Sequence, residues 1–244
     1  MTLDPAEVEA FRRAREDVLA RIAAAAARAG RDPAEVTLVA VSKTVGADRV
    51  RAAVAAGFTV LGENRVQEGA VKVPEVPGAV WHLLGPLQAN KARKAIEAFD
   101  VLEAVDSVDL AERLDRIAAE LRPRRPLPVL LQVNVAGDPA KSGFDEASVE
   151  AALPALSALE HLRLDGLMTI GRLVDTAEEA RPTFTALRDL AARLRALEPR
   201  VGPALSMGMS DDYEVAVEEG ATIVRVGRAI FGDRPRPAEP AAQG

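Results

Sequence analysis

Residues 36–64 read VTLVAVSKTVGADRVRAAVAAGFTVLGEN and contain one complete strand–helix–strand unit. The opening segment, VTLVAVS (36–42), is apolar at almost every position, which is typical of a strand buried on both faces of a parallel sheet. ADRVRAAVAAG (47–57) places apolar residues at helical spacing, and FTVLG (58–62) is apolar again. The unit therefore predicts two parallel strands joined by a helix that covers the sheet.

The same alternation of apolar strand and amphipathic helix continues along the chain. The strand-like segments are VTLVAVS (36–42), FTVLG (58–62), AVWHLLG (79–85), DVLEAV (100–105), LPVLLQVNV (127–135), LRLDGLMTIG (162–171), PALSMGM (203–209) and TIVRVG (222–227). Amphipathic stretches between them occupy residues 47–57, 90–99, 108–121, 176–197 and 211–220, whereas 63–79 combines a weak helical pattern with a proline-rich loop. Eight such units predict a (β/α)8 barrel of the TIM type rather than an open doubly wound sheet.

Two terminal segments lie outside this repeat. AEVEAFRRAREDVLARIAAAAARAG (6–30) has helical spacing and ends at Gly30, a typical C-cap, so it predicts an extra N-terminal helix. DRPRPAEPAAQG (233–244) is rich in proline and alanine and predicts a disordered C-terminal tail. We therefore expect one domain over residues 1–232, followed by that tail.

Composition argues against several functional classes. The formal net charge is −6, which disfavours a nucleic-acid partner because phosphate backbones require clustered basic surface. The chain has no cysteine, and His82 and His161 lie too far apart in sequence to show metal-ligand spacing, so we expect no metal site. The N-terminal segment lacks an apolar signal region, and no run approaches the ~20 apolar residues of a membrane span. These features predict a soluble cytoplasmic protein.

Polar residues gather where the predicted strands end, which is where barrels of this type carry their chemistry. They are Lys43, Glu63, Asn64, and those within residues 85–90, 134–141, 206–210 and 227–228. Lys43 stands out because only five of the 31 lysine and arginine residues are lysines. Lysine can lose its proton and act as an amine nucleophile, which arginine cannot. The alternative is a solvated rim lysine with no chemical role.

The last two strand ends have the features of a phosphate site. LSMGMSDDYE (205–214) offers two serine hydroxyls and Gly208, and VRVGRAIFG (224–232) offers backbone amides at Gly227. Ordinary turns, with Ser210 capping the next helix, are the alternative. Asp211 and Asp212 would repel phosphate, so we assign both to capping. A phosphate site beside a nucleophilic lysine indicates a phosphorylated aldehyde held as a Schiff base, of which pyridoxal phosphate is the commonest.

Seven segments follow one another in order: AVSKT (40–44), AGFTVLGENRVQE (56–68), WHLLGPLQANK (81–91), LLQVNVAGDPAKSGF (130–144), LDGLMTIG (164–171), LSMGMSDDYEVAVEEGAT (205–222) and VRVGRAIFG (224–232). Together they resemble the pyridoxal phosphate homeostasis protein family over roughly residues 10–232. The resemblance implies the type III pyridoxal phosphate fold, similar to the N-terminal barrel of bacterial alanine racemases. It also implies a Schiff base between pyridoxal 5′-phosphate and Lys43.

The resemblance further implies the residues that surround this ligand. Ser206 and the backbone amides of Gly227 and Arg228 would hold its phosphate, and Asn64 would line its ring. Arg228 is a departure, because the family often has threonine there, so a hydroxyl contact is lost while the amide remains. Arg65, commonly an aromatic residue in the family, is a second departure and affects only local packing.

Arg225, within the last predicted strand, would reach the pyridine nitrogen. Because arginine can only donate, that nitrogen would stay unprotonated and carbanion chemistry would be weakened. A salt-bridged barrel arginine is the alternative. The implied function is intracellular pyridoxal phosphate homeostasis: a monomeric carrier that buffers the cofactor and delivers it to apoenzymes, without strong catalysis.

Two enzymatic alternatives share the barrel. An amino-acid racemase needs a second acid or base opposite the lysine, but the sequence shows no additional β-domain, and its one tyrosine, Tyr213, follows the expected phosphate loop. A phosphosugar aldolase would use Lys43 without a resident aldehyde. Lys141 is expected at the barrel mouth as a second lysine that receives or guides cofactor. His82 is expected in the core, and His161 in an exposed loop.

Overall fold

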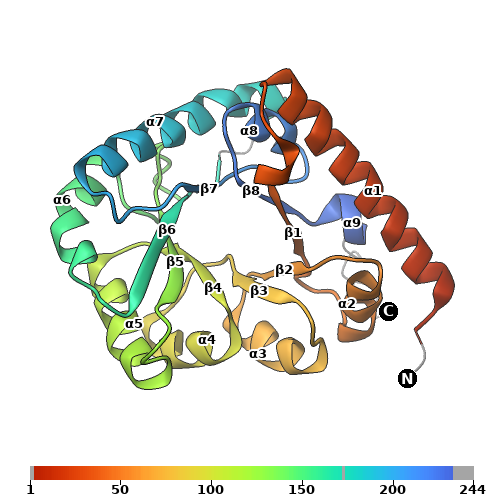
Figure 1. Cartoon of the computed structure of the whole chain (residues 1–244), viewed down its shortest axis with the longest axis horizontal. Helices are drawn as coiled ribbons and strands as arrows, with labels where there is room; N and C mark the ends of the chain where they lie inside the picture. Colours follow the sequence, from red (N-terminus) through yellow and green to blue (C-terminus); the bar gives the residue numbers. More distant parts are fainter. Residues whose placement is uncertain (1–2, 172–173, 233–244) are drawn as a thin grey trace, which may run out of the picture.

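The computed structural model describes residues 3–171 and 174–232, and its strands close into one parallel barrel (Figure 1). The strands are β1 (Thr37–Val41), β2 (Val60–Glu63), β3 (Val80–Leu83), β4 (Val101–Val105), β5 (Leu127–Gln132), β6 (Leu162–Met168), β7 (Ala204–Ser206) and β8 (Ile223–Val226). Each strand pairs in parallel with the next, and β8 closes the ring on β1 with Ala40 opposite Val226. The predicted TIM-type barrel is confirmed. The predicted tail, 233–244, lies outside the described residues.

Helices alternate with the strands and lie outside the ring (Figure 1). They are α1 (Pro5–Arg28), α2 (Ala47–Ala55), α3 (Val66–Glu75), α4 (Ala92–Ala98), α5 (Val108–Leu121), α6 (Glu146–Ser157), α7 (Arg181–Leu197), α8 (Tyr213–Glu218) and α9 (Arg228–Phe231), with 3₁₀ turns η1 (Pro33–Glu35), η2 (Ala89–Lys91) and η3 (Ala177–Ala180). In the described ranges, 3–171 and 174–232, no helix has both the length and the apolar character that a membrane span requires.

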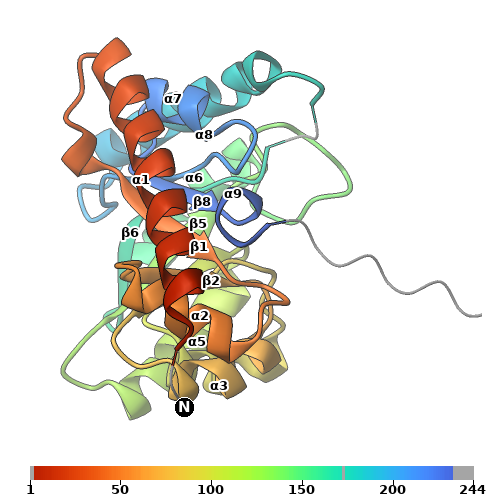
Figure 2. The same cartoon turned by 90° about the vertical axis from the view of Figure 1, so that its right-hand side faces the viewer.

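The extra N-terminal helix α1 packs on the outside of the barrel against α2, α8 and α9 (Figure 2). Asp4 begins it, because its carboxylate accepts a hydrogen bond from the amide of Ala6 at 2.9 Å. One face of the helix is buried: Phe11, Val18, Ile22, Ala25 and Ala26. The predicted helix is therefore confirmed, and it ends at Arg28, two residues before Gly30.

The inside of the barrel is a mixed apolar and charged core. Its apolar part consists of Val39, Val41, Leu84, Ala104, Leu130, Met168 and Ile223, separate from the larger core that lies between strands and helices. Two charged side chains from the strands, Glu103 and Arg225, are buried there as well, whereas Glu63 is buried on the outer side of β2 against Lys72 of α3. Charged groups are rarely buried unless they are paired, so these residues indicate where the barrel has a specific arrangement.

Two local differences from the sequence expectations matter for the site. Residues 146–157, for which no helix is predicted above, form α6, whose Asp145 cap and buried apolar face outweigh the proline at position 154. Strand β1 ends at Val41, so Lys43 lies in a turn beyond the strand rather than at its last position. Lys43 therefore belongs to a loop, and contacts other than the hydrogen bonds of the sheet must hold its backbone in place.

Candidate functional site

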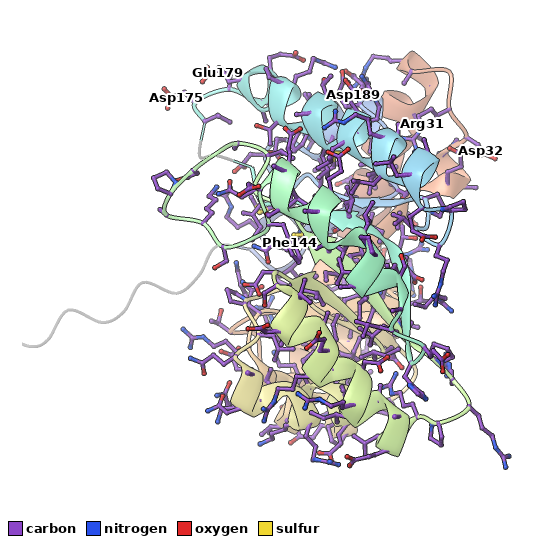
Figure 3. All side chains as sticks on the ribbon, turned by 90° about the vertical axis from the view of Figure 1, so that its left-hand side faces the viewer. Arg31, Asp32, Phe144, Asp175, Glu179 and Asp189 are labelled. Atoms are coloured by element: carbon purple, nitrogen blue, oxygen red, sulfur yellow. The ribbon has the colours of Figure 1, made fainter. Side chains whose placement is uncertain are left out.

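The carboxyl ends of the strands meet at one end of the barrel. Figure 3 shows Arg31 and Asp32, which precede β1, on the side of the molecule opposite Asp175 and Glu179, which follow β6. All strands are parallel, so the loops that follow them gather at the same end. This is the end at which the sequence placed the candidate residues.

Lys43 lies in a tight turn that follows β1. The amide of Val45 donates a hydrogen bond to the carbonyl of Ser42 at 3.0 Å, which makes Lys43 and Thr44 the central residues of the turn. Thr44 has a φ of +66°, in the left-handed region that β-branched residues rarely adopt. Lys43 itself is half-buried. Its side chain therefore projects from a bent and strained piece of backbone.

A buried cluster that the sequence did not reveal supports this turn from behind. Ser42 Oγ donates to Glu63 Oε1 at 2.8 Å, and the ammonium of Lys72 contacts both Glu63 Oε1 and, at 2.9 Å, the carbonyl of Ser42. Lys72 is 8% exposed and Glu63 is fully buried. The sequence did contain a signal for Lys72, because it is one of only five lysines in the chain, as Lys43 is.

Arg225 lies inside the barrel on β8, as predicted, and donates two hydrogen bonds there. Its Nη1 donates to Ser206 Oγ at 2.6 Å and its Nη2 to the carbonyl of Thr169 at 2.8 Å. Burial lowers the pKa of the guanidinium, and the charges of Glu103 and Asp212 oppose that shift. The side chain is a fixed donor at the centre of the barrel.

Glu103 of β4 links Arg225 to β3. Its Oε2 accepts from Ser206 Oγ at 2.5 Å, and its Oε1 lies 2.5 Å from Nδ1 of His82. Burial opposes ionisation of Glu103, but His82, Arg225 and the Ser206 hydroxyl outweigh it and hold the pKa of the carboxyl below its usual value. His82 is buried, which confirms its assignment to the core. A glutamate within the apolar segment DVLEAV was the available signal for this network.

The last two strand ends bring hydroxyl and amide donors together. The amide of Gly227, which precedes α9, donates to Ser210 Oγ at 3.2 Å. The amide of Arg228 belongs to the first turn of α9 and has no acceptor within that helix. The guanidinium of Arg228 forms an exposed ion pair with Asp211. Of the two serine hydroxyls expected at the phosphate site, Ser210 Oγ accepts from the amide of Gly227, whereas Ser206 is fully buried on Glu103 and Arg225.

The assignment of Asp211 and Asp212 to capping holds only for the position of Asp212, and not for the bonds that either side chain makes. Asp212 stands at the N-cap position of α8, but its side chain makes no capping bond; its Oδ1 accepts from the amide of Met209 at 2.6 Å instead. That bond closes the 209–212 loop on itself. Burial raises the pKa of the Asp212 carboxyl, against the opposing effects of the Met209 amide and the charge of Arg225.

The remaining candidates have the following positions. Asn64 follows β2 and is half-buried, and a Cβ on Gly85 would come within 2.0 Å of its carbonyl oxygen, so only glycine fits there. Lys141 lies on the loop after β5, and its ammonium contacts the carbonyls of Ile170 and Gly171 beyond β6. His161 is half-buried beside Asp115, at 3.6 Å between Nδ1 and Oδ2, rather than exposed as predicted.

The donor set can hold a phosphorylated aldehyde. It combines a primary amine at Lys43, amides and a hydroxyl at Gly227 and Ser210, and a buried cation at Arg225. Amides at a loop or helix start suit a phosphate, and a lysine amine is the group that condenses with an aldehyde. No group of three His, Asp or Glu side chains suited to a metal ion is found in the part of the chain that the structure describes.

Comparisons of the sequence show which proteins this chain is similar to. The family described as "Alanine racemase, N-terminal domain" matches residues 15–235. The pyridoxal phosphate homeostasis protein of Escherichia coli K12 is 42% identical over 224 residues, covering 88% of this chain and 92% of that protein. The protein of the same name from Pseudomonas aeruginosa PAO1 is 46% identical, covering 89% of this chain and 93% of its own.

Solved structures give a similar picture. PipY, the COG0325 family member of Synechococcus elongatus PCC7942, with PLP bound, is 47% identical with a TM-score of 0.77, over 86% of this chain and 100% of that chain. An alanine racemase of Clostridium difficile 630 has a TM-score of 0.68 at 16% identity, over 89% of this chain and 56% of that one. The second likeness concerns the fold alone.

Proposed function

Since this chain belongs to the family of pyridoxal phosphate homeostasis proteins, we propose that it binds pyridoxal 5′-phosphate and takes part in homeostasis of that cofactor. The ligand is held as a Schiff base on Lys43. The protein acts as a monomer in the cytoplasm, where it buffers the reactive aldehyde and delivers it to apoenzymes. These finer statements go beyond the family assignment, and the experiments on the Schiff base, on racemization and on delivery follow.

The observation that carries the proposal is the pairing of β1 with β8. Ala40 lies opposite Val226, so the turn that holds Lys43 and the amide of Gly227 follow neighbouring strand ends. A Cβ placed on Gly227 would come within 3.3 Å of the carbonyl of Val41, which shows how closely these ends approach. An amine and phosphate donors side by side are what a phosphorylated aldehyde requires.

Arg225 supports a carrier rather than a catalyst. Pyridoxal phosphate supplies an electron sink for carbanion chemistry, and it does so best when its ring nitrogen is protonated. Arg225 is buried beside Ser206 and Thr169 and can only donate hydrogen bonds. A ring nitrogen that meets this donor must accept, so it carries no proton of its own.

The alternative, an amino-acid racemase, needs a second acid or base opposite Lys43, and Tyr213 is not placed to supply it. The chain has one tyrosine, Tyr213, and its side chain is 1% exposed, beneath the guanidinium of Arg21 from α1 at 5.2 Å. Burial raises the pKa of this phenol, against the charge of Arg21. Tyr213 therefore faces the helix layer and not the barrel mouth.

Borohydride reduction followed by peptide mass mapping tests the proposal. After incubation with pyridoxal phosphate, we expect a phosphopyridoxyl group on Lys43 in the native protein and none in Lys43→Arg, which keeps the charge but cannot condense. Lys94→Arg, at an exposed position on α4, is the matched control and should be labelled normally at Lys43. An unmodified Lys43 in native protein would remove the proposed function and favour the aldolase, which traps only its own substrate.

Catalysis and delivery need separate measurements. We expect no steady conversion of L-alanine to D-alanine by the loaded protein, and such turnover would establish the racemase instead.

Lys141 is proposed to guide cofactor in transit, since its ammonium lies on the carbonyls that follow β6. Loading and release rates that are unchanged in Lys141→Ala would exclude this role.

A further inference from the structure

We propose that helix α3 positions Lys43 by fixing the backbone on both sides of it, through Lys72 on the side of Ser42 and Glu68 on the side of Thr44. Both are positioning residues, because they act on Lys43 only through its neighbours. What Lys43 binds rests on the proposed function, whereas the restraint itself is a property of the protein without ligand.

Ser42, which precedes the lysine, has every polar group occupied. Its amide donates to the carbonyl of Gly62 at 2.9 Å, and its hydroxyl donates to Glu63 Oε1 at 2.8 Å. Its carbonyl accepts from Lys72 Nζ at 2.9 Å and from the amide of Val45 at 3.0 Å. Because Ser42 is fully buried, any rotation of its peptide groups would leave a buried polar atom without a partner.

Lys72 can restrain Ser42 because burial and the contact with Glu63 fix its own ammonium in place. Its side chain is buried, and its ammonium contacts Glu63 Oε1 as well as the Ser42 carbonyl. Glu63 Oε2 has no hydrogen-bond partner within the described residues, so this carboxylate depends on Lys72 and Ser42 for its compensation. Separating a buried ion pair leaves an uncompensated charge, and the three groups therefore hold one another in place.

Thr44, which follows the lysine, is held from the same helix. Its φ of +66° is unfavourable for a β-branched residue and persists only where the surroundings impose it. Its amide donates to Glu68 Oε2 at 3.3 Å. Glu68 and Lys72 are four residues apart on α3, so they share one face of the helix. One helical face thus contacts the chain immediately before and immediately after Lys43.

The restraint that α3 exerts across the groove beside this turn is polar. A groove of about 500 Å³ separates residues 44–47 from α3, and Glu68, Val71 and Lys72 line its helical side. Val71 is 65% exposed, so apolar contact across the groove is small. A buried ion pair adds little to stability compared with apolar residues of similar size. The role that we infer for this pair is therefore the geometry that it imposes on the turn.

This geometry matters for the amine of Lys43. Condensation with an aldehyde requires the nitrogen to approach the carbonyl carbon of a ligand whose phosphate is held elsewhere. If the turn is free to change conformation, the amine spends less time within reach. Loosening either contact should therefore slow formation of the Schiff base and speed its loss.

Two variants release the two sides of the turn. Lys72→Met combined with Glu63→Gln removes both buried charges together, because Lys72→Met alone would leave Glu63 uncompensated. Glu68→Ala removes the contact to Thr44. Its matched control is Arg65→Met, which breaks only the exposed ion pair between Arg65 and Glu68. Lys94→Met, at an exposed position on α4, controls for the loss of a lysine.

Hydrogen exchange of the peptide covering residues 42–47, in protein without ligand, reports the restraint directly. We expect exchange at least about tenfold faster in both variants, and borohydride-trapped labelling of Lys43 by pyridoxal phosphate about tenfold slower. Both controls should match the native protein. Thermal unfolding of each variant ensures that only folded protein is compared.

The possible results separate the positioning role of α3 from the proposed function. Native exchange and native labelling rates in both variants would overturn the positioning role, as would equal changes in the controls. If the double variant fails to fold, Glu68→Ala decides alone, since Glu68 is half-exposed and its loss leaves no buried charge. Native protein that is never labelled at Lys43 would instead contradict the proposed function, while the exchange comparison would still test the restraint.

Discussion

Thr44 is the residue at which the described backbone departs furthest from its usual conformations. It is the one non-glycine residue with a positive φ in residues 3–171 and 174–232. A left-handed conformation costs a residue with a Cβ about 1–2 kcal/mol, and β-branching makes it less favourable still. Strain of this kind is often found beside functional groups, and here it lies next to Lys43.

Thr44→Gly should therefore not destabilise the protein. Glycine adopts this φ without strain, and the gain offsets the extra entropy of the unfolded chain, for a net change between 0 and about +1 kcal/mol. The free energy of unfolding in urea measures it. Thr59→Gly, at an exposed position with negative φ, is the control and should cost about 0.5–1 kcal/mol. Equal losses at both positions would contradict the strain at Thr44.

Glu103 is the residue on which the charges inside the barrel depend. Its carboxylate meets His82 and Ser206 and compensates the buried guanidinium of Arg225. Glu103→Gln keeps the shape but removes this charge, so we expect a loss of about 3 kcal/mol, typical of breaking a buried pair. Urea unfolding measures the loss, and Glu97→Gln, on the exposed side of α4, should be neutral. A loss below about 1 kcal/mol would show that Arg225 does not need this partner.

At the scale of elements, ion pairs tie the helix layer together around α8. Arg181, at the start of α7, contacts Glu178 and reaches across to Glu218 and Glu219 at the end of α8. Arg21 and Arg28 of α1 pair with the same short helix at Glu214 and Glu218. The six residues of α8 are thus joined by charge to the helices on either side.

These pairs predict a dependence of stability on pH. The hydrogen bond from Arg181 is the largest cause that lowers the pKa values of Glu178 and Glu218 below the 4.5 of a free glutamate. A carboxyl with a lowered folded-state pKa stabilises the protein above pH 4.5, and this contribution disappears as the pH falls through the folded value. Arg181→Met should cost about 1 kcal/mol at pH 7, because solvent screens pairs that are partly exposed.

The measurement is the free energy of unfolding of native protein and Arg181→Met between pH 3 and pH 7. The two curves should converge below pH 4.5, and added salt should reduce their separation at pH 7. Arg193→Met, which breaks a single exposed pair with Glu146 on the same helix, is the control and should lie close to the native curve. A separation that is constant with pH would exclude the charges as its cause.

At the scale of the whole molecule, closure makes every strand depend on two neighbours. β1 pairs with both β2 and β8, so the first and last strands of the described chain are joined in the sheet. Helix α1 then covers the outside near that closure, against α8 and α9 (Figure 2). The single domain expected over residues 1–232 stays a prediction. It implies that the barrel unfolds cooperatively.

We expect the chain to unfold in one transition. The single tryptophan, Trp81, is 1% exposed on β3 and reports the barrel, whereas far-ultraviolet circular dichroism reports mainly the helices. The two signals should have coincident midpoints in urea. Two separated transitions would mean that one part of the barrel unfolds independently of the other.

Much of this molecule could be predicted from local patterns. The order of the strands and helices, the extra N-terminal helix and the barrel follow from periodicity, which is a property of neighbouring residues. Lys43 stood out through its place at a strand end and the rarity of lysine. Arg225, in contrast, was identified only through the resemblance to a known family. Helix α6, with its internal proline, was not recognised because the cap at Asp145 and the packing of its apolar face decide it.

The contacts among the buried polar residues could not be predicted in this way. Ser206 Oγ meets Glu103 across 103 positions of sequence, and Arg225 joins them from a third strand. The ammonium of Lys72 reaches the carbonyl of Ser42 across 30 positions. The sequence alone determined the order of the strands and, apart from α6, which helices join them. Only the tertiary structure decided which side chains meet inside the barrel, because that depends on strand register and on closure of the ring.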